Sequence, residues 1–235
     1  MAAHPEATIV EMDTVHGTRS GPVLLTMLFR SCGFMLVFLL EHDTQECVCQ
    51  VFEHIEKAIG LESVRETFGV ILTDNGSEFK NPALIERNLA GESRTRVFYC
   101  DPMASWQKGR LERNHEFIRY ILPKGHPLDF LTKGKVCQMM NHINSTARAS
   151  LNGRTPFELA LLLLPAALLH WAGATAIPHD DRLFAPDTSG FFCISSSSLR
   201  WILTLHLTFR FCGCSVIELY RLGRLMPDSL RFSRL

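Results

Sequence analysis

Three carboxylates stand at positions where a protein with a β-sheet could build a site for hard cations. Asp74 directly follows a short apolar run at 70–72, whose β-branched residues favour a buried strand. Asp13 lies near the end of an earlier strand-like segment, and Glu112 lies within a long helical pattern. Carboxylates that converge without paired bases repel one another unless a cation joins them, and Mg²⁺ prefers such oxygen ligands. The sequence therefore predicts a metal site formed by Asp13, Asp74 and Glu112.

Each of these carboxylates also has a simpler interpretation. Asp74 begins an Asp-Asn-Gly turn signal, and Glu112 could lie on a solvated helix face. Glu116, one helical turn further along, is a rival for the third ligand. If the site binds metal, two Mg²⁺ (or Mn²⁺) ions about 3.5–4 Å apart would activate a nucleophile and stabilise the leaving oxygen in phosphoryl transfer.

The basic residues of the chain are concentrated around Glu112, although the formal net charge of the whole chain is zero. Residues 1–100 carry 8 Lys and Arg against 14 Asp and Glu, whereas residues 101–154 carry 9 against 4. A localised basic segment is what an anion-binding surface requires. The candidate contacts with a DNA backbone are Lys108, Arg110, Arg113, Asn114, Arg119 and Lys124.

Hydrophobic periodicity predicts the elements that position these residues. The predicted strands cover 8–14, 22–29, 34–40, 70–72 and 95–100. The predicted helices cover 44–60, 81–89, 105–122, 132–144 and 155–164. The first three strands have short connections and must therefore be antiparallel, whereas the later strands alternate with helices. This order predicts an α/β fold with a mixed five-stranded sheet flanked by helices, in which the first and fourth strands are neighbours.

The rest of the chain restricts its class further. Its eight cysteines show no paired CxxC spacing, so we expect reduced, buried thiols rather than a zinc site or disulfides. No signal peptide is predicted, and no apolar segment reaches the roughly 20 residues of a membrane-spanning helix. Periodicity fails after about residue 165. We therefore expect a compact core over 8–165 and an irregular, poorly ordered tail over 166–235.

Four motifs, taken in order, resemble the catalytic core of DDE transposases. They are LTDNGSEF, FYCDPMASWQKGRLERNH, IRYILPKG and MMNHINSTARASLNGRTPFE. The branch they resemble is the insertion-sequence-30 family, within the RNase H-like integrase superfamily, and the resemblance covers roughly residues 9–164. It implies an RNase H-like fold and a catalytic triad of Asp13, Asp74 and Glu112, because the spacing Gly109-x-x-Glu112 fits the family's helix motif. It also implies metal-dependent DNA cleavage and strand transfer.

The resemblance has consequences for partners and for alternative functions. It implies transposon-end and target DNA as partners, self-association, no membrane, and a place in the bacterial cytoplasm, at the nucleoid when the protein is on DNA. The family's N-terminal helix-turn-helix region has no counterpart in this sequence, so we expect a truncated copy. Two alternatives stay open: an RNase H-like nuclease, and a catalytically idle remnant that only binds DNA or self-associates.

Overall fold

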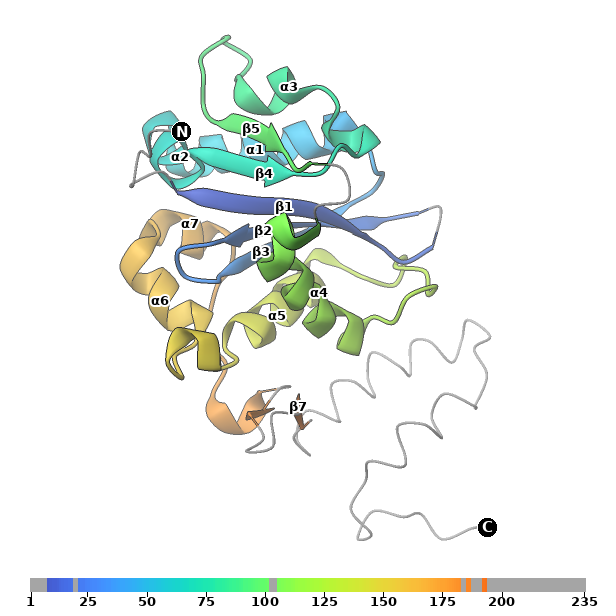
Figure 1. Cartoon of the computed structure of the whole chain (residues 1–235), viewed down its shortest axis with the longest axis vertical. Coiled ribbons are helices and arrows are strands. Elements are labelled where there is room, and N and C mark those ends of the chain that lie inside the picture. The colour runs from blue at the N-terminus through green and yellow to red at the C-terminus, as the bar shows by residue number, and fades with distance from the viewer. Residues whose placement is uncertain (1–7, 19–20, 102–104, 183–184, 187–191, 194–235) are drawn as a thin grey trace, which may run out of the picture. The chain divides into compact units, whose positions relative to one another are not determined.

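Five strands form one mixed sheet in the order β3-β2-β1-β4-β5 (Figure 1). The computed structural model describes residues 8–18, 21–101, 105–182, 185–186 and 192–193, and every structural statement below concerns these residues. The strands are β1 (Ile9–His16), β2 (Val23–Phe29), β3 (Met35–Leu40), β4 (Val70–Thr73) and β5 (Arg96–Tyr99). β1 pairs antiparallel with β2 and parallel with β4. The predicted α/β class with a mixed five-stranded sheet flanked by helices is confirmed, including the neighbouring first and fourth strands.

Helices fill the connections between the strands and follow the last of them. They are α1 (Gln45–Ile59), α2 (Leu61–Thr67), α3 (Pro82–Glu86), α4 (Gly109–Ile121), α5 (Lys133–Asn144), α6 (Pro156–Leu163) and α7 (Ala166–Trp171). Short 3-10 turns cover Ser77–Phe79, Ser105–Lys108, Ala149–Leu151 and His179–Asp181, and a two-stranded ribbon pairs Ala185–Pro186 with Phe192–Cys193. The predicted N-cap Thr44 accepts a hydrogen bond from the Cys47 amide. Helix α2 was not predicted.

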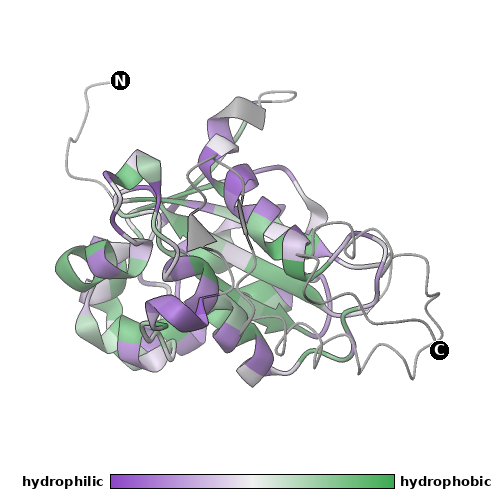
Figure 2. Cartoon of the chain, turned by 90° about the horizontal axis from the view of Figure 1, so that it is seen from below, coloured by the Kyte–Doolittle hydropathy of each residue, from purple (hydrophilic) through white to green (hydrophobic). Residues whose placement is uncertain are grey.

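The sheet lies between α1 on one face and α4 on the other (Figure 1). Phe29 of β2 belongs to the α1 face, since its ring contacts Phe68, which in turn contacts Phe52 of α1. Glu11 of β1 belongs to the opposite face, because its carboxylate accepts a hydrogen bond from the Leu111 amide of α4. Figure 2 shows the hydrophobic residues gathered along the strands between these helices. This arrangement places α4 directly over β1, the strand that carries Asp13.

One buried side chain forms hydrogen bonds with the backbone of the edge strand β3. Asn144, at the end of α5, accepts a hydrogen bond from the Met35 amide and donates one to the Met35 carbonyl oxygen. It therefore replaces the missing neighbour strand at that residue.

The core continues beyond the boundary predicted at residue 165. Helix α7 buries Leu168 and Leu169, and the Trp171 ring lies 5.8 Å from that of Phe38. The Ile177 amide donates to Ser145 Oγ of the core. The physical reason is that α7 has apolar positions to bury, although its six residues are too few to show a clear helical period. The rest of the predicted tail lies largely outside the described residues and stays a prediction.

Two further expectations concern the cysteine residues and membrane-spanning helices. The described cysteines Cys32, Cys47, Cys49, Cys100 and Cys137 are free thiols, but of these only Cys32 is buried, whereas the other four are partly exposed. Among the described residues, no helix combines the length and the apolar character needed to cross a membrane.

Candidate active site

The strand register brings Asp13 and Asp74 together. In the parallel pair of β1 and β4, Glu11 lies opposite Leu72. Two residues further along each strand, Asp13 and Asp74 therefore stand at the same level and on the same face. β4 ends just before Asp74, whereas β1 continues to His16. The expectation that Asp13 lies near the end of its strand is thus corrected: it lies inside β1, because Thr14, Val15 and His16 after it remain paired with β2.

The two carboxylates are oriented in the same way. Asp13 Oδ1 accepts a hydrogen bond of 2.8 Å from the Thr14 amide, and Asp74 Oδ1 accepts one of 3.2 Å from the Gly76 amide. In each residue the backbone thus holds one oxygen, and the other, Oδ2, points to a shared position. That position is filled by Lys108 Nζ, which lies 3.1 Å from Asp13 Oδ2 and 3.2 Å from Asp74 Oδ2.

Burial and charge act in opposite directions on this ion-pair cluster. Burial raises the pKa of Asp13, and the nearby Asp74 raises it further, while Lys108 opposes both effects. For Lys108 burial favours the neutral amine, but the two carboxylates outweigh it and raise the pKa of the ammonium group. The Lys108 side chain is only 7% exposed, so it is a cation of the protein interior.

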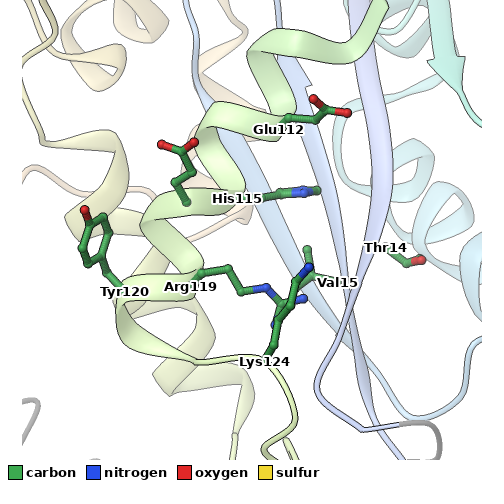
Figure 3. A pocket seen from close by; sticks show the side chains of 8 residues that line it. Thr14, Val15, Glu112, His115, Arg119, Tyr120 and Lys124 are labelled. Carbon is green, nitrogen blue, oxygen red and sulfur yellow. The ribbon is translucent and has the colours of Figure 1, made fainter. Parts of the chain in front are cut away.

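Glu112 lies on the exposed side of α4 and lines a pocket of about 570 Å³. Figure 3 shows Glu112 and His115 extending from α4 toward the strands, while Tyr120 points away from them. In the described part of the chain, the only three ligand-type side chains whose atoms lie within 4.8 Å of one another are His16, Asp43 and Glu78. The structure therefore brings Asp13 and Asp74 together on either side of Lys108 Nζ. The carboxylates of Asp13, Asp74 and Glu112, however, do not all lie within 4.8 Å of one another.

The helix that carries Glu112 is fixed to β1 by a second buried carboxylate, which sequence reasoning missed. Glu11 is 1% exposed; its Oε2 accepts from the Leu111 amide at the start of α4, and its Oε1 pairs with Arg30 Nε at 2.6 Å. Arg30 also donates to the Gln107 carbonyl oxygen, and Arg110 donates to that of Arg30. The available signal in the sequence was an acidic residue within a strand that is rich in apolar residues.

A histidine links the middle of α4 to the sheet. His115 Nε2 lies 2.9 Å from Thr26 Oγ1, and the Thr26 hydroxyl donates to the Asp13 carbonyl oxygen. Since the Thr26 proton is used in that bond, His115 donates from Nε2. Burial, followed by the charges of Lys108 and Arg119, lowers the pKa of His115 to about 4.

The predicted DNA contacts fall into two groups. Arg110, Arg113 and Lys124 are exposed, and Arg119 lines the pocket together with Lys124 while donating to the His16 carbonyl oxygen. By contrast, Asn114 is 3% exposed and donates to the Arg110 carbonyl oxygen, one helical turn before it. Asn114 and Lys108 thus point into the protein rather than toward the exposed side expected for a DNA contact.

A second cluster of polar side chains borders the site. His16 Nε2 lies 3.4 Å from Asp43 Oδ2, and Thr14 Oγ1 donates to Glu78 Oε1. Burial, and then the charge of Glu78, raise the pKa of Asp43. A Cβ atom on Gly76 would lie 2.5 Å from Glu78 Oε2, so glycine at this turn leaves room for the buried carboxylate. The sequence signal was Glu78 itself, inside the DNGSEF motif.

Comparisons with known proteins agree with the motif resemblance. The chain is 25% identical over 149 residues to the transposase for insertion sequence element IS4351 of Bacteroides fragilis, which covers 63% of this chain and 43% of that protein. It is 26% identical over 151 residues to transposase InsI of IS30C from Escherichia coli K12, covering 63% and 37%. Its homologues are insertion-sequence transposases. The chain is also 29% identical over 91 residues to the transposase for insertion sequence element IS1086 of Cupriavidus metallidurans, a match that covers 39% of this chain and 26% of that protein.

The chain spans less than half the length of each of these transposase homologues. No family model matches it. Among solved structures, the catalytic core domain of BIV integrase matches with a TM-score of 0.44 and 18% identity, covering 66% of this chain and 93% of that one. A simian T-cell lymphotropic virus intasome in complex with PP2A regulatory subunit B56 gamma matches with a TM-score of 0.46 and 14% identity, covering 64% and 53%.

Proposed function

We propose that residues 8–165 form the catalytic core of a DDE-type DNA transposase, a polynucleotidyl transferase that cleaves DNA and transfers a strand. Asp13, Asp74 and Glu112 are the proposed metal ligands. The observation that carries the proposal is the convergence of Asp13 Oδ2 and Asp74 Oδ2 on one cationic group, within 3.2 Å of each. The transposase homologues, each of which matches 63% of this chain, support it.

The donor atoms at this position fit a hard divalent cation. They are carboxylate oxygens, the ligands that Mg²⁺ and Mn²⁺ take, and their second oxygens are already held by backbone amides. Burial raises the pKa of the Asp13 carboxyl, and a cation beside its ionised form opposes this effect. Two ions bound here would activate the attacking hydroxyl and stabilise the leaving oxygen.

Each residue has a separate task in this proposal. Asp13, within β1, and Asp74, directly after β4, would hold the metal, and Glu112 would complete the ligand set from α4. Because Glu112 is exposed, a change of its rotamer can bring its carboxylate toward the two aspartates when metal and DNA are bound. Arg119 and Lys124, which line the pocket beside Glu112, neutralise the phosphates that approach the metal.

Strand transfer with pre-cleaved transposon-end DNA tests this function. We expect the purified chain to join the 3′-hydroxyl of the end to a target duplex in Mg²⁺ or Mn²⁺. The variants Asp13→Asn, Asp74→Asn and Glu112→Gln should each lose at least about 100-fold of this activity, since each removes a metal ligand. Glu116→Gln, one turn along the same helix, is the matched control and should stay active.

The same assay separates the alternatives. Metal-dependent cleavage without joining would favour an RNase H-like nuclease. DNA binding with neither reaction would favour an idle remnant. Activity in Asp74→Asn equal to that of the unchanged protein would contradict the site itself.

DNA binding by the basic residues gives a second expected result. Contacts between these cations and phosphates predict affinity that is largely independent of sequence and falls steeply with salt. Replacing Arg119 or Lys124 with Ala should each reduce the slope of log K against log salt by about one unit. Fluorescence anisotropy on random and transposon-end duplexes measures this slope, with the exposed Lys57→Ala on α1 as the control. A strong preference for one sequence, or unchanged slopes, would place the DNA on another face.

The remaining parts of the proposal concern assembly and location. We infer self-association on transposon-end and target DNA and a place in the bacterial cytoplasm, at the nucleoid when the protein is on DNA. Sedimentation of the chain with and without end DNA tests the assembly, and a monomer in both conditions would contradict it.

A further inference from the structure

Lys108 occupies the position that a metal ion shared by Asp13 and Asp74 requires. Its Nζ lies 3.1 and 3.2 Å from the Oδ2 atoms of the two aspartates. A Mg²⁺ ion bound to the same two atoms would lie about 2.0–2.1 Å from each. The point between the two oxygens therefore cannot hold the ammonium group and the ion at once.

We propose that Lys108 is the internal counter-ion of the metal-free site, and that metal binding displaces its ammonium group from between Asp13 and Asp74. The inference rests on the proposed function, because it takes these two aspartates as metal ligands. It assigns to Lys108 a role in controlling metal occupancy, which differs from the simple DNA contact expected from its place in the sequence.

The need for a counter-ion follows from the burial of the cluster. The side chain of Asp13 is 21% exposed and that of Lys108 is 7% exposed, so water compensates little of either charge. Two converging carboxylates repel one another in this setting, and the ammonium group between them removes the repulsion. A divalent ion compensates the same two charges more fully, so it can replace the ammonium group when its concentration suffices.

The surroundings of Lys108 allow this exchange. Lys108 precedes the first residue of α4, and its φ of −109° and ψ of 24° are not helical, so the helix need not move with it. Next to it, a Cβ built on Gly109 meets no atom within 4 Å, which leaves open space beside the backbone. The Asp74 side chain is 50% exposed and provides a route from the cluster to solvent.

Displacement has a functional consequence for DNA binding. An ammonium group that leaves the two aspartates remains within one side-chain length of the metal site, where the phosphate backbone must approach. Metal and DNA should then strengthen each other's binding, since the first ligand releases a cation for the second. In the absence of metal, Lys108 lowers the apparent metal affinity because the competent state is only partly populated.

Metal titration of the whole chain tests the competition. Isothermal titration with Mn²⁺ should give an apparent Kd about tenfold lower for Lys108→Met than for the unchanged protein, since the competing cation is gone. Met keeps most of the length of the side chain without its charge. Lys57→Met, on the exposed side of α1, is the matched control and should leave the Kd unchanged. An equal or weaker affinity in Lys108→Met would overturn the inference.

A measurement on the unchanged protein does not depend on the variant folding. Reductive methylation followed by peptide mass spectrometry should modify Lys108 several-fold faster in saturating Mg²⁺ than in EDTA, with Lys57 modified equally in both. Unchanged labelling of Lys108 would overturn the inference while leaving strand transfer, and hence the proposed function, untouched. Faster labelling and tighter metal binding without strand transfer would do the reverse: they would support the exchange and contradict the transposase activity.

Discussion

His115 is kept neutral by its surroundings, and this makes stability depend on pH. Its pKa is lowered to about 4, first by burial and then by the positive charges of Lys108 and Arg119. As a neutral donor it completes the chain of hydrogen bonds through Thr26 to the backbone of Asp13. A residue of α4 thereby supports the strand that carries one proposed metal ligand.

The contribution of His115 to the free energy of unfolding decreases as the pH falls. An unfolded histidine has a pKa of about 6.5, so between pH 4 and 6.5 the unfolded state binds more protons than the folded state. The contribution of His115 is therefore fully present above about pH 6.5 and is lost as the pH falls toward 4, up to about 3 kcal/mol in total. Urea unfolding at several pH values should show this loss in the unchanged protein and a shallower one in His115→Gln.

The exposed His54→Gln on α1 is the matched control and should keep the full slope. His142, whose pKa burial likewise lowers to about 4, continues to contribute in both variants. Identical pH profiles for His115→Gln and the unchanged protein would contradict the role of burial at His115.

The sequence predicted some of these residues and missed others for identifiable reasons. Asp74 follows an apolar run and begins a turn, and both signals are local, so its position at the strand end could be predicted. Lys108 was expected to contact DNA from the predicted helix over 105–122, but it lies at the end of the 3-10 turn before α4, and its side chain is buried. Glu11 was missed because its partners, Arg30 and Leu111, lie far from it in sequence.

At the scale of the elements, α4 is positioned mainly at its first turn. The Glu11 carboxylate accepts from the Leu111 amide there and is paired with Arg30. A negative group at a helix N-terminus satisfies an amide that has no partner within the helix and interacts favourably with the helix dipole. The position of Glu112 over the sheet thus depends on a buried residue of β1.

Replacing Glu11 tests this anchor. Glu11→Ala should lower the free energy of unfolding by about 2–4 kcal/mol, since it leaves the Leu111 amide and Arg30 without their acceptor. Glu11→Gln should lose less, because its amide oxygen can still accept from Leu111. Glu62→Gln, which breaks the exposed pair with Arg65, should change stability by less than about 1 kcal/mol. Urea unfolding measures all three, and a loss in Glu11→Ala no larger than in Glu62→Gln would refute the anchoring role.

Most of the helices and strands could be predicted from the sequence, and the two helices that were missed are short. The order of strands and the parallel pair of β1 and β4 follow from connection lengths, which the sequence reveals directly. Helices α2 and α7 have seven and six residues, too few for a period of 3.6 to stand out from the flanking loops.

At the scale of the whole molecule, the described core closes with α7 and the segment that follows it. Asn141 of α5 donates to the Gly173 carbonyl oxygen and accepts from the Thr175 amide, and the Ile177 amide donates to Ser145. These bonds attach residues 166–177 to the core, whereas sequence periodicity placed the boundary at 165. We propose that the cooperative core extends to about residue 182.

Shortened chains test this boundary. A chain ending at residue 182 should unfold cooperatively, within about 1 kcal/mol of the full chain. A chain ending at residue 164 should be several kcal/mol less stable, because it loses the burial of Leu168 and Leu169, each worth about 1.5–3 kcal/mol. Thermal and urea unfolding compare them, and a chain ending at 182 that cannot fold would show that later residues complete the core.

Anomalous scattering from crystals grown with Mn²⁺ tests the central claim most directly, because it locates the metal without relying on activity. The account predicts a manganese peak between Asp13 Oδ2 and Asp74 Oδ2, with Lys108 Nζ withdrawn from both. Manganese only at His16, Asp43 and Glu78, or no manganese beside the two aspartates at saturating concentration, would contradict it.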